Sequence, residues 1–197
     1  MKKSDMPTKI LLIGIGNSSR GDDALGWRIA DNVTQVSGIH VEYRYQLQIE
    51  DADLIKDYDV VIFADATREI IPDGFTFLPV DAAGNIAFST HRLSPSAVLS
   101  LCEEIYGRHP EAFTLALTGT QWELGLGISP EGTAALNKAN QFVTAWIEER
   151  AVSNFETAPY QLNKQTTNLL SQSLRGHHPV EGNGHGIVVA TAAAKVY

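Results

Sequence analysis

Residues 14–26 decide the fold of this chain, and they have the sequence GIGNSSRGDDALG. The apolar run 9–13 precedes them and has the composition of a buried strand, whereas apolar residues at helical spacing, beginning with Trp27, follow them. The stretch is therefore predicted to be a glycine-rich turn between a strand and a helix. In open α/β sheets, turns at the carboxyl ends of parallel strands hold the ligands. The neighbouring carboxylates of Asp22 and Asp23 repel each other, so a cation, a proton or backbone N–H groups must compensate them.

Strands and helices alternate along the first 150 residues. The predicted strands are 9–13, 39–45, 59–64, 75–80 and 112–117, with 121–124 as a candidate short strand, and the predicted helices are 22–36, 50–56, 94–107 and 129–147. Pro79 cannot donate a ladder hydrogen bond, which favours an edge position for the strand 75–80. The alternation predicts an α/β fold, namely a three-layer α/β/α sandwich with a mostly parallel twisted sheet of about five strands.

Length and composition fit one globular domain with an appendage. The chain has 197 residues, of which 44% are hydrophobic, and this is enough for a full core. The composition changes after residue 150 and becomes rich in Asn, Gln, Thr and Ser. We therefore expect an α/β domain at 1–150 and a polar, disordered C-terminal tail at 151–197, with one helical stretch around 162–174.

Charge and cysteine content exclude several classes of function. The formal net charge of −8 disfavours binding to nucleic acid or to an anionic membrane surface. The chain has one cysteine, Cys102, so an internal disulfide framework is excluded and a reducing compartment is expected. The apolar run after Ile10 is short and is interrupted by Gly14 and Gly16, and it therefore fits neither a signal peptide nor a membrane span. These features predict a cytoplasmic protein.

Asp23, Asp65 and His91 are the candidate site residues. Asp23 follows the first predicted strand, Asp65 follows the central one, and His91 lies in a polar loop just before the helix that starts at Ser94. Two carboxylates and an imidazole suit a divalent ion such as nickel, zinc or manganese, with positions left open for water or a substrate group. The other interpretations are structural: an Asp after a strand is often a turn residue, and a loop histidine is often solvated.

A nucleotide site is the alternative for the glycine-rich turn. Ser19 occupies the third glycine position of a Gly-x-Gly-x-x-Gly fingerprint, and acidic Asp22 and Asp23 would repel a pyrophosphate at the helix N-terminus. We therefore expect Asp22 to cap the first helix and Asp23 to face a metal. Gly14, Gly16 and Gly26 are expected to permit tight backbone geometry and close approach of the substrate.

Four ordered motifs resemble those of the hydrogenase maturation proteases, over residues 8–150. They are Gly14-x-Gly16-Asn17-x-x-x-x-Asp22-Asp23-x-x-Gly26, Phe63-Ala64-Asp65-Ala66, His91-x-x-x-Pro95 and Trp122-Glu123-Leu124-Gly125-x-Gly127-x-Ser129-Pro130. The segment 46–50, with the sequence QLQIE, is similar to a branch of that family that carries Gln-Leu-x-Pro-Glu.

The resemblance implies an endopeptidase that removes the C-terminal extension of a nickel–iron hydrogenase large-subunit precursor. Asp23, Asp65 and His91 match the family's metal-contacting positions, and the metal is the nickel already inserted in the precursor, contacted transiently rather than bound permanently as a cofactor. A metal-polarised water and a carboxylate general base are both open as the hydrolytic route. The implied protein is monomeric. The alternatives are a non-catalytic metal-sensing or chaperone-like module for the large subunit and a nucleotide-binding α/β protein.

Overall fold

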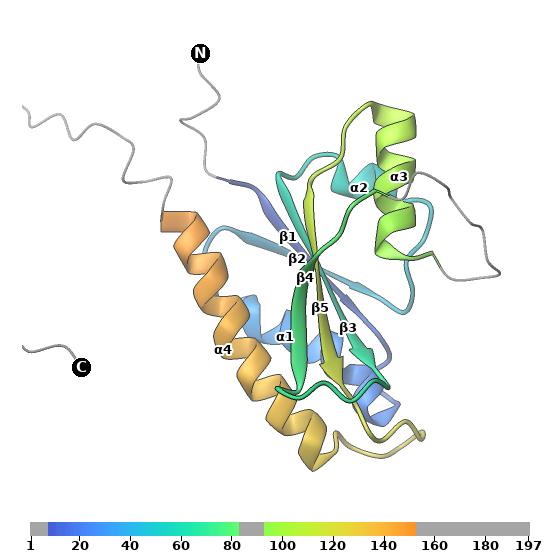
Figure 1. The fold of residues 1–197 in the computed structure, drawn as a ribbon, viewed down its shortest axis with the longest axis vertical. Coiled ribbons are helices and arrows are strands. Elements are labelled where there is room, and N and C mark those ends of the chain that lie inside the picture. The colour runs from blue at the N-terminus through green and yellow to red at the C-terminus, as the bar shows by residue number, and fades with distance from the viewer. Residues whose placement is uncertain (1–7, 83–92, 153–197) are drawn as a thin grey trace, which may run out of the picture. The chain divides into compact units, whose positions relative to one another are not determined.

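A five-stranded sheet forms the centre of the part of the chain that the structure describes, residues 8–82 and 93–152 (Figure 1). The computed structural model gives the strand order β2-β1-β3-β5-β4. The strands are β1 (Ile10–Ile15), β2 (Ile39–Arg44), β3 (Val60–Thr67), β4 (Phe75–Pro79) and β5 (Glu111–Thr118). All neighbours pair in parallel except β4 and β5. The predicted fold class is confirmed, and β4 occupies the edge that Pro79 favoured.

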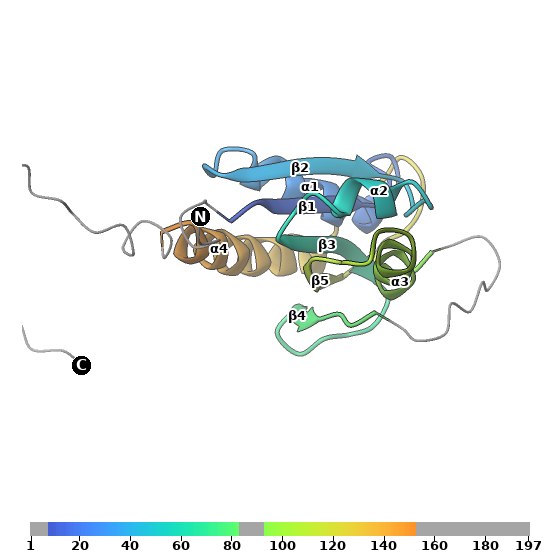
Figure 2. The same cartoon turned by 90° about the horizontal axis from the view of Figure 1, so that it is seen from above.

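Helices cover both faces of this sheet (Figure 2). The helices are α1 (Leu25–Val33), α2 (Asp51–Ile55), α3 (Pro95–Tyr106) and α4 (Pro130–Val152), and a 3-10 turn, η2 (Gly21–Ala24), precedes α1. Side chains of α1 and α4, such as Ile29 and Val143, pack in one cluster with Leu12. Side chains of α2 and α3, such as Ile55 and Leu99, pack with Phe63 on the opposite face. The three predicted layers are therefore present.

Two glycines let α1 approach β1 closely. A Cβ atom on Gly26 would lie 2.3 Å from the carbonyl oxygens of both Ala64 and Ile15. A Cβ atom on Gly14 would lie 2.6 Å from the carbonyl oxygen of Gly26. Because backbone atoms cannot yield as a side chain can, both positions require glycine. The close approach that they permit is that of α1 to the strands, and the expected close approach of a substrate stays a prediction.

The start of α3 follows its sequence signals. Ser94 is the N-cap, and its hydroxyl accepts a hydrogen bond from the N–H of Ala97 at 3.2 Å. Pro95 occupies the first turn, and Gly107 ends the helix in the left-handed conformation, with φ 66°. The loop that carries His91 lies outside the described residues, so only its attachment to the start of α3 is described.

Two local predictions were wrong. Residues 121–124 form a loop rather than a short strand, because their backbone is tied to the turn after β1 and not to a strand. The first helix starts as the 3-10 turn η2, and its α-helical part ends at Val33 instead of residue 36.

The predicted tail lies almost wholly outside the described residues. α4 continues through residue 150 and ends at Val152, and the helical stretch expected around 162–174 falls beyond it. Among the helices of the described residues, none combines the length and the apolar character that crossing a membrane requires.

Replacing Gly26 tests the close approach of α1. The Gly26→Ala variant is expected to lose at least about 2 kcal/mol of unfolding free energy, because the added methyl group meets backbone oxygens on two strands. Gly127→Ala is the matched control, since a Cβ atom there meets nothing within 4 Å, and it should stay within about 0.5 kcal/mol of the parent. Urea denaturation measures both. Equal stability of the two variants would contradict this packing.

Candidate functional site

The turn after β1 is closed by its own backbone. Gly16 has φ 140°, and a Cβ atom there would lie 1.8 Å from the carbonyl oxygen of Asp23. The N–H of Asn17 donates to that same carbonyl at 3.0 Å, and the Asn17 side chain accepts from the N–H of Ser19 at 2.9 Å. Gly16 therefore confirms the prediction of tight backbone geometry, and the turn fixes the position of Asp23.

Asp22 is fully buried and does not cap its own helix. Its Oδ2 atom accepts from the N–H groups of Thr120 (2.6 Å) and Gln121 (2.9 Å). Ser129 donates twice, from its N–H to Oδ1 and from its hydroxyl to Oδ2, each at 2.7 Å. The Ser129 hydroxyl in turn accepts from the N–H of Gly132 in the first turn of α4. The prediction that Asp22 caps the first helix was therefore wrong, because its carboxylate binds Ser129, the residue directly before α4.

The hydrogen bonds to Asp22 stabilise its charged form. Burial by itself would raise the pKa of this carboxyl, but the hydrogen bonds from Ser129, Gln121 and Thr120 outweigh it and lower the pKa below its ordinary value of 3.8. Backbone N–H groups and a hydroxyl thus compensate the negative charge of Asp22, the first of the two neighbouring carboxylates.

Small residues make room for this contact. A Cβ atom added to Gly119 would lie 2.7 Å from the Cβ atom of Asp22, and one added to Gly132 would lie 2.5 Å from its Oδ1 atom. A Cβ atom added to Gly21 would lie 2.4 Å from the carbonyl oxygen of Gln121. Backbone hydrogen bonds also join the two loops, from Asp22 to Gln121 (2.7 Å) and from Gly125 to Ser19 (2.9 Å). Residues 17–23 and 119–129 therefore form one structural unit, which we name the paired loops.

Asp23 differs from its neighbour in every respect that matters for ligand binding. It is half-buried in η2, and its carboxylate takes no hydrogen bond and no ion pair from the described residues. Its backbone is fixed on both sides, through its own N–H to the carbonyl of Arg20 and through its carbonyl to Asn17. A rigidly held carboxylate with open coordination positions is what a transient cation contact requires.

Asp65 lies near the carboxyl end of β3, next to β1. Its Oδ1 atom accepts from the N–H of Ala66 at 2.8 Å, and the residue is half-buried. The register pairs Gly14 with Ala64, so Asp65 lies in β3 beside the end of β1 that leads into the turn of Asp23. His91 lies outside the described residues, and among those described no three His, Cys, Asp or Glu side chains gather to hold a metal ion. The three-residue site thus stays a prediction.

A cavity of about 340 Å³ lies beside Asp65. It is bounded by the ends of β1, β3 and β5, by the segment 45–47 and by the start of α3. The residues that line it include Ile15, Leu47, Phe63, Asp65, Pro95 and Ala116.

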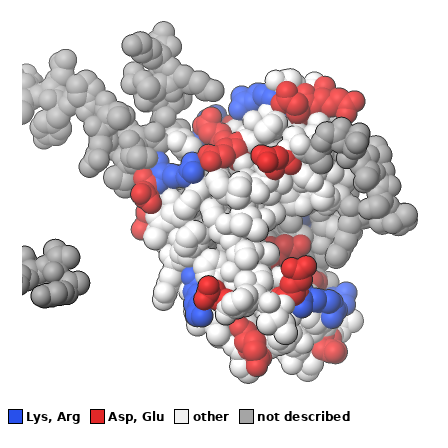
Figure 3. All heavy atoms as spheres, viewed as in Figure 1, with Lys and Arg blue, Asp and Glu red and all other residues white. Residues whose placement is uncertain are grey.

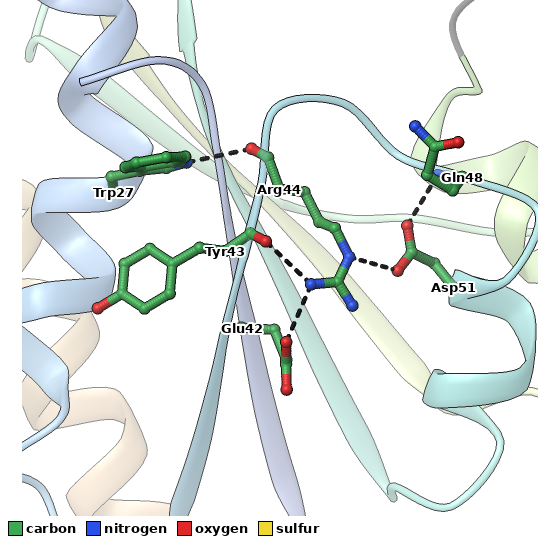
Figure 4. Close-up of polar contacts among 6 residues, drawn as sticks. All are labelled: Trp27, Glu42, Tyr43, Arg44, Gln48 and Asp51. Carbon is green, nitrogen blue, oxygen red and sulfur yellow. Dashed lines mark hydrogen bonds and ion pairs between the residues drawn. The ribbon is translucent and has the colours of Figure 1, made fainter. Parts of the chain in front are cut away.

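Arg44 directly precedes the segment 45–47 that lines this cavity, and its polar contacts hold the start of that segment (Figure 4). Its guanidinium donates to Asp51 at 2.8 Å and to Glu42 at 2.9 Å, and Asp51 also accepts from the N–H of Gln48. Its carbonyl accepts from the N–H of Gly16 and from the indole of Trp27. Burial would lower the pKa of Arg44, but the two carboxylates outweigh it and raise the pKa. The sequence analysis missed this residue.

Cys102 offers no competing site. It is buried in α3, burial raises the pKa of its thiol, and the Sγ atom donates to the carbonyl of Arg108. The reactive form of a cysteine is the thiolate, so this residue belongs to the core.

Comparison with known proteins identifies the fold. No protein family and no curated protein matches the sequence. Solved structures do match: the hydrogenase maturating endopeptidase HybD from E. coli is similar with a TM-score of 0.57 and 23% identity, covering 72% of this chain and 93% of that one. The [NiFe] hydrogenase maturation protease HycI from Thermococcus kodakarensis has a TM-score of 0.53 and 23% identity, with coverages of 74% and 93%.

A third structure extends the same likeness. The hydrogenase 2 maturation peptidase from Thaumarchaeota archaeon SCGC_AB-539-E09 has a TM-score of 0.52 and 21% identity, covering 71% of this chain and 97% of that one. The described domain therefore has the fold of the hydrogenase maturation endopeptidases.

The contrast between Asp22 and Asp23 gives a prediction about stability. Asp22→Asn should lose about 2–4 kcal/mol of unfolding free energy at pH 7, because an amide cannot accept all the hydrogen bonds and leaves a buried donor unpaired. Asp23→Asn is the matched control and should stay within about 0.5 kcal/mol, since its carboxylate accepts nothing from the described residues. Denaturant unfolding separates the two, and similar losses would contradict the assignment.

The lowered pKa of Asp22 also predicts a pH dependence. A carboxyl group whose folded-state pKa lies below the unfolded value contributes stability that is present at neutral pH and is lost as the pH falls through the folded pKa. The stability gap between the parent and Asp22→Asn should therefore narrow as the pH is lowered from about 5 towards about 2. Urea titrations across this range measure the gap, and a constant gap would show that Asp22 is not ionised in the fold.

Proposed function

We propose that this chain is an endopeptidase that removes the C-terminal extension of a nickel–iron hydrogenase large-subunit precursor after nickel insertion. The fold is that of proteins named as hydrogenase maturation proteases. The four sequence motifs resemble those of that family and occur in its order. The nickel belongs to the substrate and serves as the recognition element. In this proposal the enzyme is cytoplasmic and monomeric, and it holds no permanent cofactor.

The observation that carries the proposal is the unequal state of the two neighbouring carboxylates. Asp22 is saturated by hydrogen bonds, whereas Asp23, fixed by the same turn, keeps its oxygens available at the end of β1. Asp65 lies near the carboxyl end of the adjacent strand β3 and is the second proposed ligand, and His91 is the third. Carboxylates and imidazole are suitable ligands for nickel.

Three protein ligands also explain why nickel would be checked rather than retained. A divalent ion held by so few groups needs further ligands, and these would come from the precursor itself. Asp23 and Asp65 would then contact the ion only while the precursor is bound, and the nickel content of the precursor would control its cleavage. The bound ion can polarise a water molecule or a carbonyl group, whereas this chain's residues position the peptide.

Cleavage of nickel-loaded and nickel-free precursor tests the proposal directly. The nickel-loaded large subunit should lose the mass of its C-terminal extension, and the nickel-free form should stay intact, as followed by mass spectrometry. Cleavage of both forms would remove the metal-sensing part. If the precursor binds but no peptide is released, the chain is a binding module and not a protease.

Substitution of the proposed ligands should abolish processing without unfolding the domain. Asp23→Asn and His91→Ala are each expected to lower the processing rate by more than about a hundredfold, because replacing even an outer partner of a metal ligand costs up to that much. His109→Ala is the matched control for the histidine variant. His109 is exposed and lies before the start of β5, whereas Asp65 pairs with Ala116 near the end of β5. Circular dichroism melting checks the fold. Normal processing by the two ligand variants would show that the site is misassigned.

A further inference from the structure

The cavity beside Asp65 lies at the point where the strand order of the sheet reverses. β1 is flanked by β2 on one side and by β3 on the other, and the helices of the two connections, α1 and α2, cover opposite faces. Open α/β sheets bind their ligands at this point, outside the carboxyl ends of the strands. Ile15 of β1 and Phe63 and Asp65 of β3 border the cavity there.

The chemistry of the cavity favours an apolar side chain. Leu47 and Pro95 contribute apolar surface opposite the strands, and among the described residues that line it Asp65 is the only charged group. An acidic side chain in the cavity would be repelled by the Asp65 carboxylate. The chain's net charge of −8 acts in the same direction, and the described atoms on the face seen in Figure 3 form no continuous basic surface.

The wall formed by residues 45–47 is held in place before any ligand arrives. Arg44 anchors its start to Asp51, and Asp51, which is 2% exposed, holds its far end through the N–H of Gln48. The ring of Tyr45 lies 5.2 Å from that of Trp27 and borders the cavity. Preformed walls lower the ordering cost of binding and sharpen the choice of ligand.

From this geometry we infer that the cavity is a subsite for one large apolar side chain of the peptide substrate, next to the bond that is cleaved. The inference rests on the proposed function, which places the peptide at Asp65. The side chain enters the cavity while the peptide backbone remains outside it. Ala116, on the β5 strand that pairs with β3 beside Asp65, sets the depth available to the side chain.

Filling the cavity tests the subsite. Ala116→Leu should lower kcat/KM for the nickel-loaded precursor by about tenfold to two-hundredfold, because a hydrophobic pocket discriminates by that much per methylene group. Ala134→Leu is the matched control, since Ala134 is exposed on α4 outside this cavity, and it should process the precursor like the parent. Thermal melting should place both variants within a few degrees of the parent.

Variants of the substrate complete the experiment. Once the cleaved bond is mapped by mass spectrometry, the two residues that flank it are replaced one at a time by Ala and by Asp. Replacing the residue that occupies the subsite should reduce kcat/KM, more by Asp than by Ala, and the Ala form should be affected less by Ala116→Leu than the native precursor is. A loss of structure in Ala116→Leu would slow the cleavage of all substrate variants equally, so this coupling between enzyme and substrate variants indicates direct contact.

Arg44→Lys examines the wall separately. Lysine cannot bridge Asp51 and Glu42 with a planar fork, so KM should rise while kcat changes little. The subsite is overturned if the parent cleaves the precursor and Ala116→Leu cleaves every substrate variant at the parental rate. If the parent cleaves no precursor, the proposed function falls, and the subsite falls with it.

Discussion

The buried carboxylate of Asp22 joins parts of the chain that lie 98 to 107 residues apart. It accepts hydrogen bonds from the loop after β5 and from Ser129, the residue directly before α4. An ionised group without exposed surface is tolerated only when its partners are complete, because a buried charge that lacks them costs several kcal/mol. The contact therefore fixes the start of α4 and the rim of the sheet together, and three glycines are required to bring the backbones close enough.

This constraint also determines what Asp23 can do. The two acids are adjacent in sequence, and the backbone that turns Asp22 inward leaves Asp23 half-buried with no described partner. Hydrogen-bond donors offset the charge of Asp22, whereas no donor among the described residues reaches the carboxylate of Asp23. The first acid in the turn after β1 is therefore a structural anchor and the second is the proposed ligand, whose backbone is held by the bonds among Asn17, Arg20 and Asp23.

Local sequence patterns predicted most of the fold but only part of the site. Apolar runs gave β1 and β3, Ser94 and Pro95 gave the start of α3, and Pro79 gave the edge position of β4, since each depends on neighbouring residues alone. The partners of Asp22 could not be predicted because they lie about a hundred residues away and are mostly backbone N–H groups, which carry no sequence signal. Residues 121–124 were a candidate strand in the sequence because the hydrogen bonds that join Gln121 to the distant Asp22 could not be predicted either. The bridge from Arg44 to Asp51 depends on how β2 and α2 meet, and a charge pattern in sequence does not reveal that.

Two segments near the end of β1 are held by different sets of contacts. The paired loops are closed by backbone hydrogen bonds and the Asp22 carboxylate, whereas the segment 45–48, part of which lines the cavity, is held by Arg44 and Asp51. The carbonyl of Arg44 accepts a hydrogen bond from the N–H of Gly16, so the two sets of contacts meet at the end of β1, directly before the turn that carries Asp23. In the proposed reaction, discrimination would then come from what the precursor brings, its nickel and its side chain, because the described rim is already ordered to receive both.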